Sequence, residues 1–320
     1  MKTYILTRIA SSILTLFLVI SFSFFLFRIL PGDPATALTG DPRLPAESKE
    51  AVYKMFGLDK PLLEQYLLFL VNTIKGNLGI SFQYKTPVFN ILMEKLVNTL
   101  ILLIPATVLS ILLGVLVGLI AGLYKGKKVD NLIRSIATLV WSTPSFWAGM
   151  LAVYLFAVNI RLFPTGGMLR IGTSFSLENI GDLLWHLFLP MMVYAIIYSG
   201  QYALLVRESL DNVLTEDFMM LARAKGYSNF KIMTRYALRN VLLPLVSLIG
   251  INFGNIILGS ITIESVFSWP GIGRLVYDAI FYNDYPLLQG VFLFFSTFMI
   301  ISMVFIDILY TYLDPRIRFR

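Results

Sequence analysis

Six long apolar runs constrain the fold of this chain more than any other feature. A hydrocarbon core about 30 Å thick needs about 20 apolar helical residues to cross it, and a helix pairs its backbone hydrogen-bonding groups internally. Short segments of alternating polarity, as in a membrane β-barrel, are not seen. We therefore predict an all-α polytopic membrane protein with six transmembrane helices, formed by residues 9–30, 99–123, 135–160, 183–206, 241–263 and 287–309.

Composition and charge agree with that class and indicate its orientation. Hydrophobic residues make up 57% of the 320 residues and charged residues only 14%, which is too apolar for a water-soluble domain. Short loops rich in Lys and Arg stay on the cytoplasmic side of a membrane. We predict an inner-membrane protein with both termini in the cytoplasm, because the inner segments then carry Lys2, Arg8 and the basic residues within 125–134, 207–239 and 316–320.

The net charge of +7 is explained by this orientation. The cations are dispersed between the apolar runs, and no basic module with interleaved aromatic residues is seen, so nucleic acid is not an expected partner. Membrane lipid is.

The chain is expected to be organised around these runs. Residues 1–30 form an N-terminal tail and the first span, and residues 31–98 form an extracytoplasmic cap with short helices at 46–56 and 61–74. Residues 99–310 form a five-helix core with a cytoplasmic loop at 207–241, and residues 311–320 form a tail. The first run has a cleaved signal peptide as its alternative interpretation, but its length and Pro34 favour a retained anchor.

One face of the second cap helix holds apolar residues at helical spacing. Leu63, Leu67, Leu70 and Ile74 share this face, and packing against the membrane domain is favoured over ligand binding. In the second apolar run Gly114, Gly118, Gly122 and Gly126 recur at every fourth position. Small residues at this spacing let another helix approach closely, so we predict a helix-packing face.

Prolines and a few ionisable groups stand within or beside the apolar runs. Pro105 and Pro144 are expected to bend their helices. Ionisable groups in lipid are functional candidates, but Arg28 and Asp307 lie near span ends. His186 lies close to the outer surface, where a packing or interfacial role is favoured over a proton relay.

No enzyme motif is present. The sequence has one histidine and no cysteine, and it contains no G-x-x-x-x-G-K-[ST], H-E-x-x-H or G-x-S-x-G. We therefore predict a chain that catalyses nothing and holds neither a metal nor a cofactor.

A mixed-charge segment between the fourth and fifth runs is built as a short helix. Thr215 is suited to cap it, and Glu216 and Asp217 are acidic residues in its first turn. Phe218, Leu221 and Ala222 are expected to share an apolar face, and Gly226 suits a left-handed stop. An apolar face outside the membrane favours docking onto a partner.

A second helix is expected to follow this segment. This helix aligns Lys231, Arg235 and Arg239 as a basic stripe. The simplest interpretation of the stripe is that it anchors the helix to anionic lipid headgroups.

Several motifs, taken in order, resemble permease subunits of ATP-binding cassette (ABC) importers in the dipeptide, oligopeptide and nickel branch. The resemblance covers nearly the whole chain and favours the first of the two permeases that such systems encode. In the loop it lies in residues 222–226 (ARAKG), residues 237–240 (ALRN) and Pro244. Elsewhere it lies in residues 30–35 (LPGDPA), 79–81 (GIS), 144–149 (PSFWAG), 163–167 (FPTGG), 264–273 (ESVFSWPGIG), 284–286 (DYP) and 313–316 (LDPR).

This resemblance implies the fold of a type I importer permease and a set of partners. These are a second homologous permease, two ABC ATPases that bind ATP and Mg²⁺, and an extracytoplasmic substrate-binding protein. The ATPase-coupling contacts that it implies are Asp217, Phe218, Leu221, Ala222, Arg223, Ala224, Lys225 and Gly226. The wider family pattern is Glu-Ala-Ala, then three residues, then Gly. Here its first two positions are Met220 and Leu221, and Ala222 and Gly226 match.

The resemblance leaves the substrate open. Peptides are the favoured substrate, with nickel or metal chelates and oligosaccharides as alternatives. A stand-alone channel or secondary carrier is the rival from another class, and an intramembrane protease that uses His186 is a more distant one.

Overall fold

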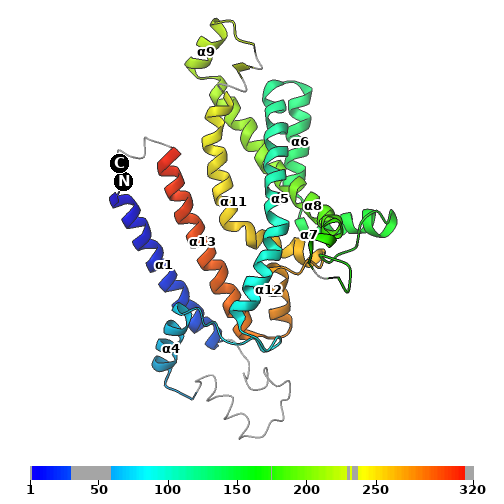
Figure 1. The fold of residues 1–320 in the computed structure, drawn as a ribbon. Coiled ribbons are helices and arrows are strands. Elements are labelled where there is room, and N and C mark those ends of the chain that lie inside the picture. The colour runs from blue at the N-terminus through cyan, green and yellow to red at the C-terminus, as the bar shows by residue number, and fades with distance from the viewer. Residues whose placement is uncertain (1, 30–58, 174, 229–230, 233–236, 314–320) are drawn as a thin grey trace. The chain divides into compact units, whose positions relative to one another are not determined.

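The computed structural model describes residues 2–29, 59–173, 175–228, 231–232 and 237–313. Within these residues the regular elements are helices, apart from one isolated bridge between Ile80 and Pro87. The helices are α1 (Lys2–Ile29), α4 (Leu62–Ile74), α5 (Val88–Leu123), α6 (Lys128–Ser142), α7 (Ser145–Ala152), the π-helix η1 (Val153–Asn159), the 3-10 turn η2 (Leu177–Asn179), α8 (Ile180–Leu214), α9 (Asp217–Ala224), α11 (Leu238–Val266), α12 (Ile272–Phe281) and α13 (Tyr285–Leu313) (Figure 1).

The chain folds as two compact units. The first comprises Met1–Asn98 with Gly271–Phe305, and the second comprises Thr99–Pro270 with Ile306–Arg320. The domain boundaries expected from the sequence follow the chain, whereas each unit combines segments that are far apart in it.

In the first unit, the start of α5 packs against α12 and α13. Val88 and Leu92 of α5, Ile272 of α12 and Leu287 of α13 are buried in one apolar cluster. Loop residues are fixed to this cluster by a buried carboxylate: Asp284 accepts hydrogen bonds from the Ser81 hydroxyl and from the backbone N–H groups of Gln83 and Leu287. The motifs at 79–81 and 284–286 are therefore partners.

The cap helix α4 packs on α1 through a different face from the predicted one. The ring of Phe24 contacts the rings of Tyr66 and Phe69, and the Tyr66 hydroxyl is hydrogen-bonded to Ser21. Leu63 and Ile74 are 70% and 79% exposed, so the predicted packing face is wrong. The aromatic rings bury more surface and present a polar handle, which explains why they displace the leucines. The other expected cap helix, at 46–56, lies outside the described residues.

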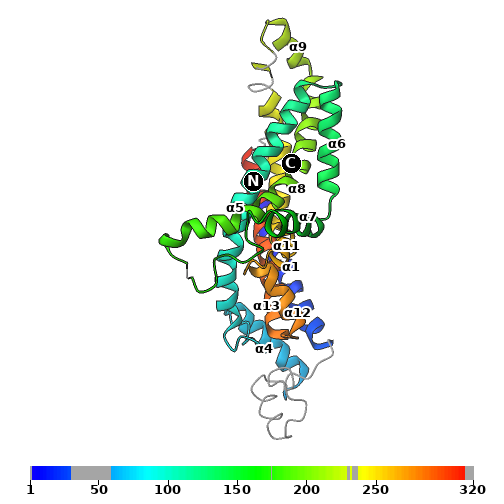
Figure 2. The same cartoon turned by 90° about the vertical axis from the view of Figure 1, so that its right-hand side faces the viewer.

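In the second unit, α5 and α6 form a hairpin, α6 packs on α8, and α8 packs on α11 (Figures 1 and 2). The glycines of α5 meet α8. A Cβ on Gly114 would clash with Tyr202, and one on Gly118 would lie 2.8 Å from the Ala203 carbonyl oxygen. Gly122 is buried, but Gly126 lies past the helix end with φ +78°, so it does not belong to the packing face.

Four of the described helices are long and apolar enough to cross a membrane, namely α1, α5, α8 and α13. The third predicted span, residues 135–160, is instead broken: α6 and the helix beginning at Ser145 are bent by 95°, and together they make a fifth candidate. Thr143 is extended, with ψ 126°, because Pro144 disfavours helical geometry in the residue before it. Pro105 behaves differently and lies inside the continuous α5.

The remaining loop motifs meet at the end of α11. Gly149 of α7 packs against Val266, and the Ser145 hydroxyl is 2.8 Å from that of Thr262. The Gly167 N–H donates to the Phe267 carbonyl oxygen (2.8 Å), while Gly166 lies so close to Phe267 that no Cβ fits. Residues 144–149, 163–167 and 264–269 therefore form one packed junction within this unit.

Candidate functional site

The predicted docking helix is present as α9, which lies beyond the ends of α8 and α11 in both views (Figures 1 and 2). The helix α9 is held in this position by an apolar cluster that it shares with α8 and α11. Met219 and Ala222 of α9 are buried against Leu210 of α8 and Val241 of α11, with Ile232 from the returning segment. The helix is therefore a packed extension of two long helices.

The residues of α9 divide into an inner and an outer face. Ala222 is 5% exposed, but Leu221 is 64% exposed and Met220 is 66% exposed. The prediction that Leu221 and Ala222 share a face is therefore wrong, because the three-residue spacing from Met219 to Ala222 already fills the inner face. The outer face comprises Asp217, Met220, Leu221 and Ala224, all exposed and at positions i, i+3, i+4 and i+7.

The rest of the predicted coupling set lies at the helix end or is described by its backbone alone. Lys225 and Gly226 are exposed in the turn after α9. Phe218 and Arg223 belong to the helix, and their side chains lie outside the description, as do those of Arg235 and Arg239 in the expected basic stripe. Lys231 instead lies over the ring of Tyr227, 4.0 Å from its centroid.

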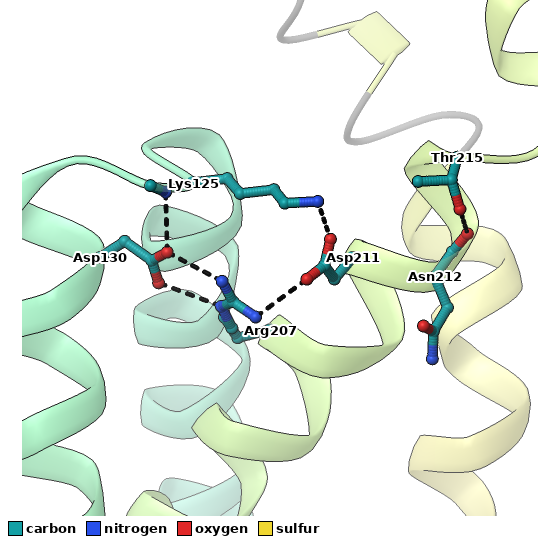
Figure 3. Close-up of polar contacts among 7 residues, drawn as sticks. Lys125, Asp130, Arg207, Asp211, Asn212 and Thr215 are labelled. Atoms are coloured by element: carbon teal, nitrogen blue, oxygen red, sulfur yellow. Dashed lines mark hydrogen bonds and ion pairs between the residues drawn. The ribbon is translucent and has the colours of Figure 1, made fainter.

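Gly226 ends α9 in the way that the sequence predicts. Its φ is +73°, and the N–H of Tyr227 donates to the carbonyl oxygen of Ala222, which is the hydrogen bond of a Schellman stop. The expected cap at the other end is wrong. The Thr215 hydroxyl donates to the Asn212 carbonyl oxygen (2.7 Å), so this residue closes α8 (Figure 3).

A cluster of charges ties the end of α8 to the first turn of α6 and to the loop between α5 and α6 (Figure 3). Arg207 donates to both carboxylate oxygens of Asp130, at 3.0 and 2.9 Å, and to Asp211 at 3.1 Å. Asp130 is 1% exposed and also accepts the Gly126 N–H at 2.9 Å. Lys125 reaches Asp211 from the same loop. We name Asp130, Arg207 and Asp211, with Lys125, the charge clasp.

The motifs and this architecture are matched by known proteins. Residues 114–319 match the family described as "Binding-protein-dependent transport system inner membrane component", and residues 1–103 match its N-terminal family. The chain belongs to this family of transport permeases.

Relatives match the permease from end to end. It is 33% identical to the "Oligopeptide transport system permease protein AppB" of Bacillus subtilis and 34% identical to the "Glutathione transport system permease protein GsiC" of Escherichia coli K12, each over 100% of both chains. A solved structure, "Inward facing conformations of the MetNI methionine ABC transporter", is similar in fold, with a TM-score of 0.56 and 15% identity over 70% of this chain and 96% of the other.

The sequence does not reveal that two acidic side chains of the permease are buried. Glu264 of α11 is fully buried and accepts a hydrogen bond from the Thr99 hydroxyl of α5 at 2.8 Å. The predicted fifth span ends at Ile263, one residue earlier. Asp130 stands among the basic residues of 125–134, which indicate the orientation of the chain but not a buried carboxylate.

His186 of the permease is a packed residue near the start of α8. It is 8% exposed, and its Nδ1 lies 2.8 Å from the Asp182 carbonyl oxygen and 3.5 Å from the Asp182 carboxylate. Within the described ranges no group of three His, Cys, Asp or Glu side chains could hold a metal ion.

Proposed function

We propose that this chain is a peptide-importing permease subunit of an ABC transporter and that the outer face of α9 docks onto a cytoplasmic ATPase. The observation that carries the proposal is the outer face itself. Met220 and Leu221 are mostly exposed although α9 already has a complete apolar core on its other side. Exposed adjoining apolar side chains on a fixed helix are typical of a protein interface.

The expected assembly has two six-span permeases, two ATPases and an external substrate-binding protein, with the termini of this chain in the cytoplasm. ATP binding closes the ATPases and moves α9. Because α9 packs on the ends of both α8 and α11, its movement is delivered to both helices. The charge clasp extends the movement to the α5–α6 hairpin through Arg207 and Asp130. ATP and Mg²⁺ bind to the ATPases.

Peptides are proposed as the substrate because the named relatives transport oligopeptides and glutathione, which is itself a peptide. Metal chelates and oligosaccharides are the competing substrates. A permease that passes a chelate need not bind the metal itself, so transport of each class has to be measured directly with the binding protein that serves this chain.

A docking experiment tests the proposal. Leu221→Asp places a charge on the outer face, and burial of one leucine is worth about 1.5–3 kcal/mol, so the ATPases should bind this permease about 10-fold more weakly or worse. Ile171→Asp is the matched control, because Ile171 is a fully exposed apolar residue in the loop between η1 and η2.

Co-purification of the ATPases and nucleotide-dependent peptide uptake into proteoliposomes are the measurements. Normal ATPase binding by the Leu221→Asp permease would contradict the docking face. Peptide flux through the permease without ATPases or nucleotide would favour a stand-alone channel or carrier.

A further inference from the structure

Two amide side chains meet where α8 crosses α11, in the middle of the apolar part of the second unit. Asn252 stands halfway along the apolar run 241–263, and Gln201 belongs to the run 183–206. The Nδ2 atom of Asn252 donates to Gln201 Oε1 at 3.0 Å and to the Tyr202 hydroxyl at 3.1 Å. The amide nitrogen of Asn252 therefore uses both of its hydrogens inside the protein.

One acceptor and one donor group of the two amides remain without a hydrogen bond in this network. Among the residues that the structure describes, Asn252 Oδ1 and Gln201 Nε2 have no hydrogen-bond partner, and both side chains are half-buried. Polar groups at this depth are costly against lipid, and they face either the interior of a bundle or a water-filled cavity. In a permease, a water-filled cavity between the helices belongs to the substrate path.

Tyr202 holds the pair in position. Its side chain is 1% exposed, and Gly114 of α5 lies so close to its Cβ that no larger residue fits there. The Tyr202 hydroxyl is therefore delivered to Asn252 by the packing of α5 on α8. Tyr202 is a positioning residue, and the two amides are the groups left to meet a ligand.

We propose that Gln201 and Asn252 form a contact site for the peptide backbone within the translocation path. This inference rests on the proposed peptide-import function. A peptide unit presents one C=O acceptor and one N–H donor, which complement Gln201 Nε2 and Asn252 Oδ1. Two neutral hydrogen bonds are also modest in strength, which suits a site that must release its substrate.

The chemistry of the Gln201–Asn252 pair predicts which substrates it selects. Backbone amides are common to all peptides, so this site accepts peptides of different sequence, whereas it offers a bare cation a single neutral amide oxygen. Side-chain selectivity then belongs to the binding protein. A substrate without a peptide N–H lacks one of the two contacts.

The experiment compares amide-removing variants with a matched control in the assembled transporter. Asn252→Leu and Gln201→Met remove the two contact groups. Gln289→Met is the control, since Gln289 of α13 also bridges two apolar helices, with its Nε2 3.3 Å from the Ser23 hydroxyl of α1, but belongs to the first unit. Each variant is reconstituted with its ATPases and binding protein, and the uptake of a peptide is compared with that of its backbone N-methylated analogue.

We expect Asn252→Leu and Gln201→Met to reduce peptide uptake by about 10-fold for each contact that is lost, with binding of the ATPases and thermal stability close to those of Gln289→Met. The wild type should transport the N-methylated peptide more slowly than the parent peptide, and in Asn252→Leu this difference between the two rates should be smaller. Because the binding protein is the same throughout, its own preference is present in every variant and does not account for a difference between them.

Two results would overturn the inference. One is uptake by both variants at the rate of the Gln289→Met control. The other is unchanged discrimination against the N-methylated peptide by Asn252→Leu, which would mark the pair as a helix-packing contact only. Failure of the proposed function is distinguishable, because the wild-type assembly itself would then show no nucleotide-dependent peptide uptake.

Discussion

The charge clasp gives a prediction whose size follows from the burial of Asp130. Arg207→Met keeps most of the side-chain length but removes the guanidinium group. Asp130, 1% exposed, then loses both charge-assisted hydrogen bonds and keeps only the Gly126 N–H. Removing one partner of a buried ion pair costs about 3–5 kcal/mol, and two hydrogen bonds to a charged group at about 1.5–3 kcal/mol each agree with this range.

The converse change should be milder. In Asp130→Leu the guanidinium of Arg207 keeps its contact with Asp211 at 3.1 Å, and its side chain is already 16% exposed. The double variant Asp130→Leu with Arg207→Met has no unpaired charge at the site. Because apolar replacements of a buried pair are often neutral, it should be more stable than Arg207→Met alone.

Thermal unfolding of the purified permease, followed in one lipid or detergent for all four proteins, measures this order of stability. We expect the unfolding temperatures of the wild type and the double variant to lie near one another, that of Asp130→Leu to be lower and that of Arg207→Met to be the lowest. This order is refuted if Arg207→Met unfolds with the wild type, or if the double variant is as unstable as Arg207→Met. Uptake should separate from stability. The double variant lacks the buried Asp130–Arg207 pair and keeps only the Lys125–Asp211 pair of the charge clasp, so it should transport poorly although it is folded.

Three further changes test other parts of the structure. Gly226→Val should uncouple transport from ATP hydrolysis without loss of membrane insertion. The φ of Gly226 is +73°, which strains a β-branched residue even though no atom lies within 4 Å of the added Cβ. Normal uptake together with normal ATPase stimulation would contradict this prediction. Gly114→Leu should lower stability by more than the about 1–3 kcal/mol of ordinary overpacking, since even a Cβ clashes with Tyr202, and the unfolding midpoint measures this. Ser81→Ala should destabilise the first unit by about 1–3 kcal/mol by removing one donor from buried Asp284, seen as faster proteolysis of that unit; wild-type resistance would count against the bond.

The sequence predicts the helices of this fold well where one physical rule decides. Apolar runs of about 20 residues mark α1, α5, α8, α11 and α13, because membrane thickness sets the length of an apolar run. The helices α5 and α8, of 36 and 35 residues, extend beyond their runs. The left-handed stop at Gly226 is likewise a local property of glycine. Where two rules compete the prediction is less complete. The bend predicted at Pro144 is present, but at 95° it divides the run into two helices, whereas Pro105 stays inside one helix.

Contacts between distant segments are the part that the sequence does not reveal. Asp130 and Arg207 are 77 positions apart, and their pairing depends on how α6 packs against α8. The inner face of α9 is similar. Met219 and Leu221 are both apolar, and only the position of the cluster from α8 and α11 decides that Met219 is buried and Leu221 exposed. The sequence likewise shows motifs only one by one. Only the structure shows that residues 79–81 contact 284–286 and that residues 144–149 contact 264–269.

One continuous helix connects the proposed partner-binding and substrate-binding groups. Along α8 the chain passes from Gln201 to Arg207 of the charge clasp, then to Leu210 in the core of α9, and ends at Leu214. The 13 steps from Gln201 to Leu214 correspond to about 20 Å at a rise of about 1.5 Å per residue. No proline or glycine interrupts this stretch, so it bends little under load. A tilt of α9 therefore tilts α8 and moves Gln201 with it. Asn252 moves with α11. The two amides separate when α8 and α11 move by different amounts. The hydrogen bond between them is consequently the contact that should differ most between the loaded and the released transporter.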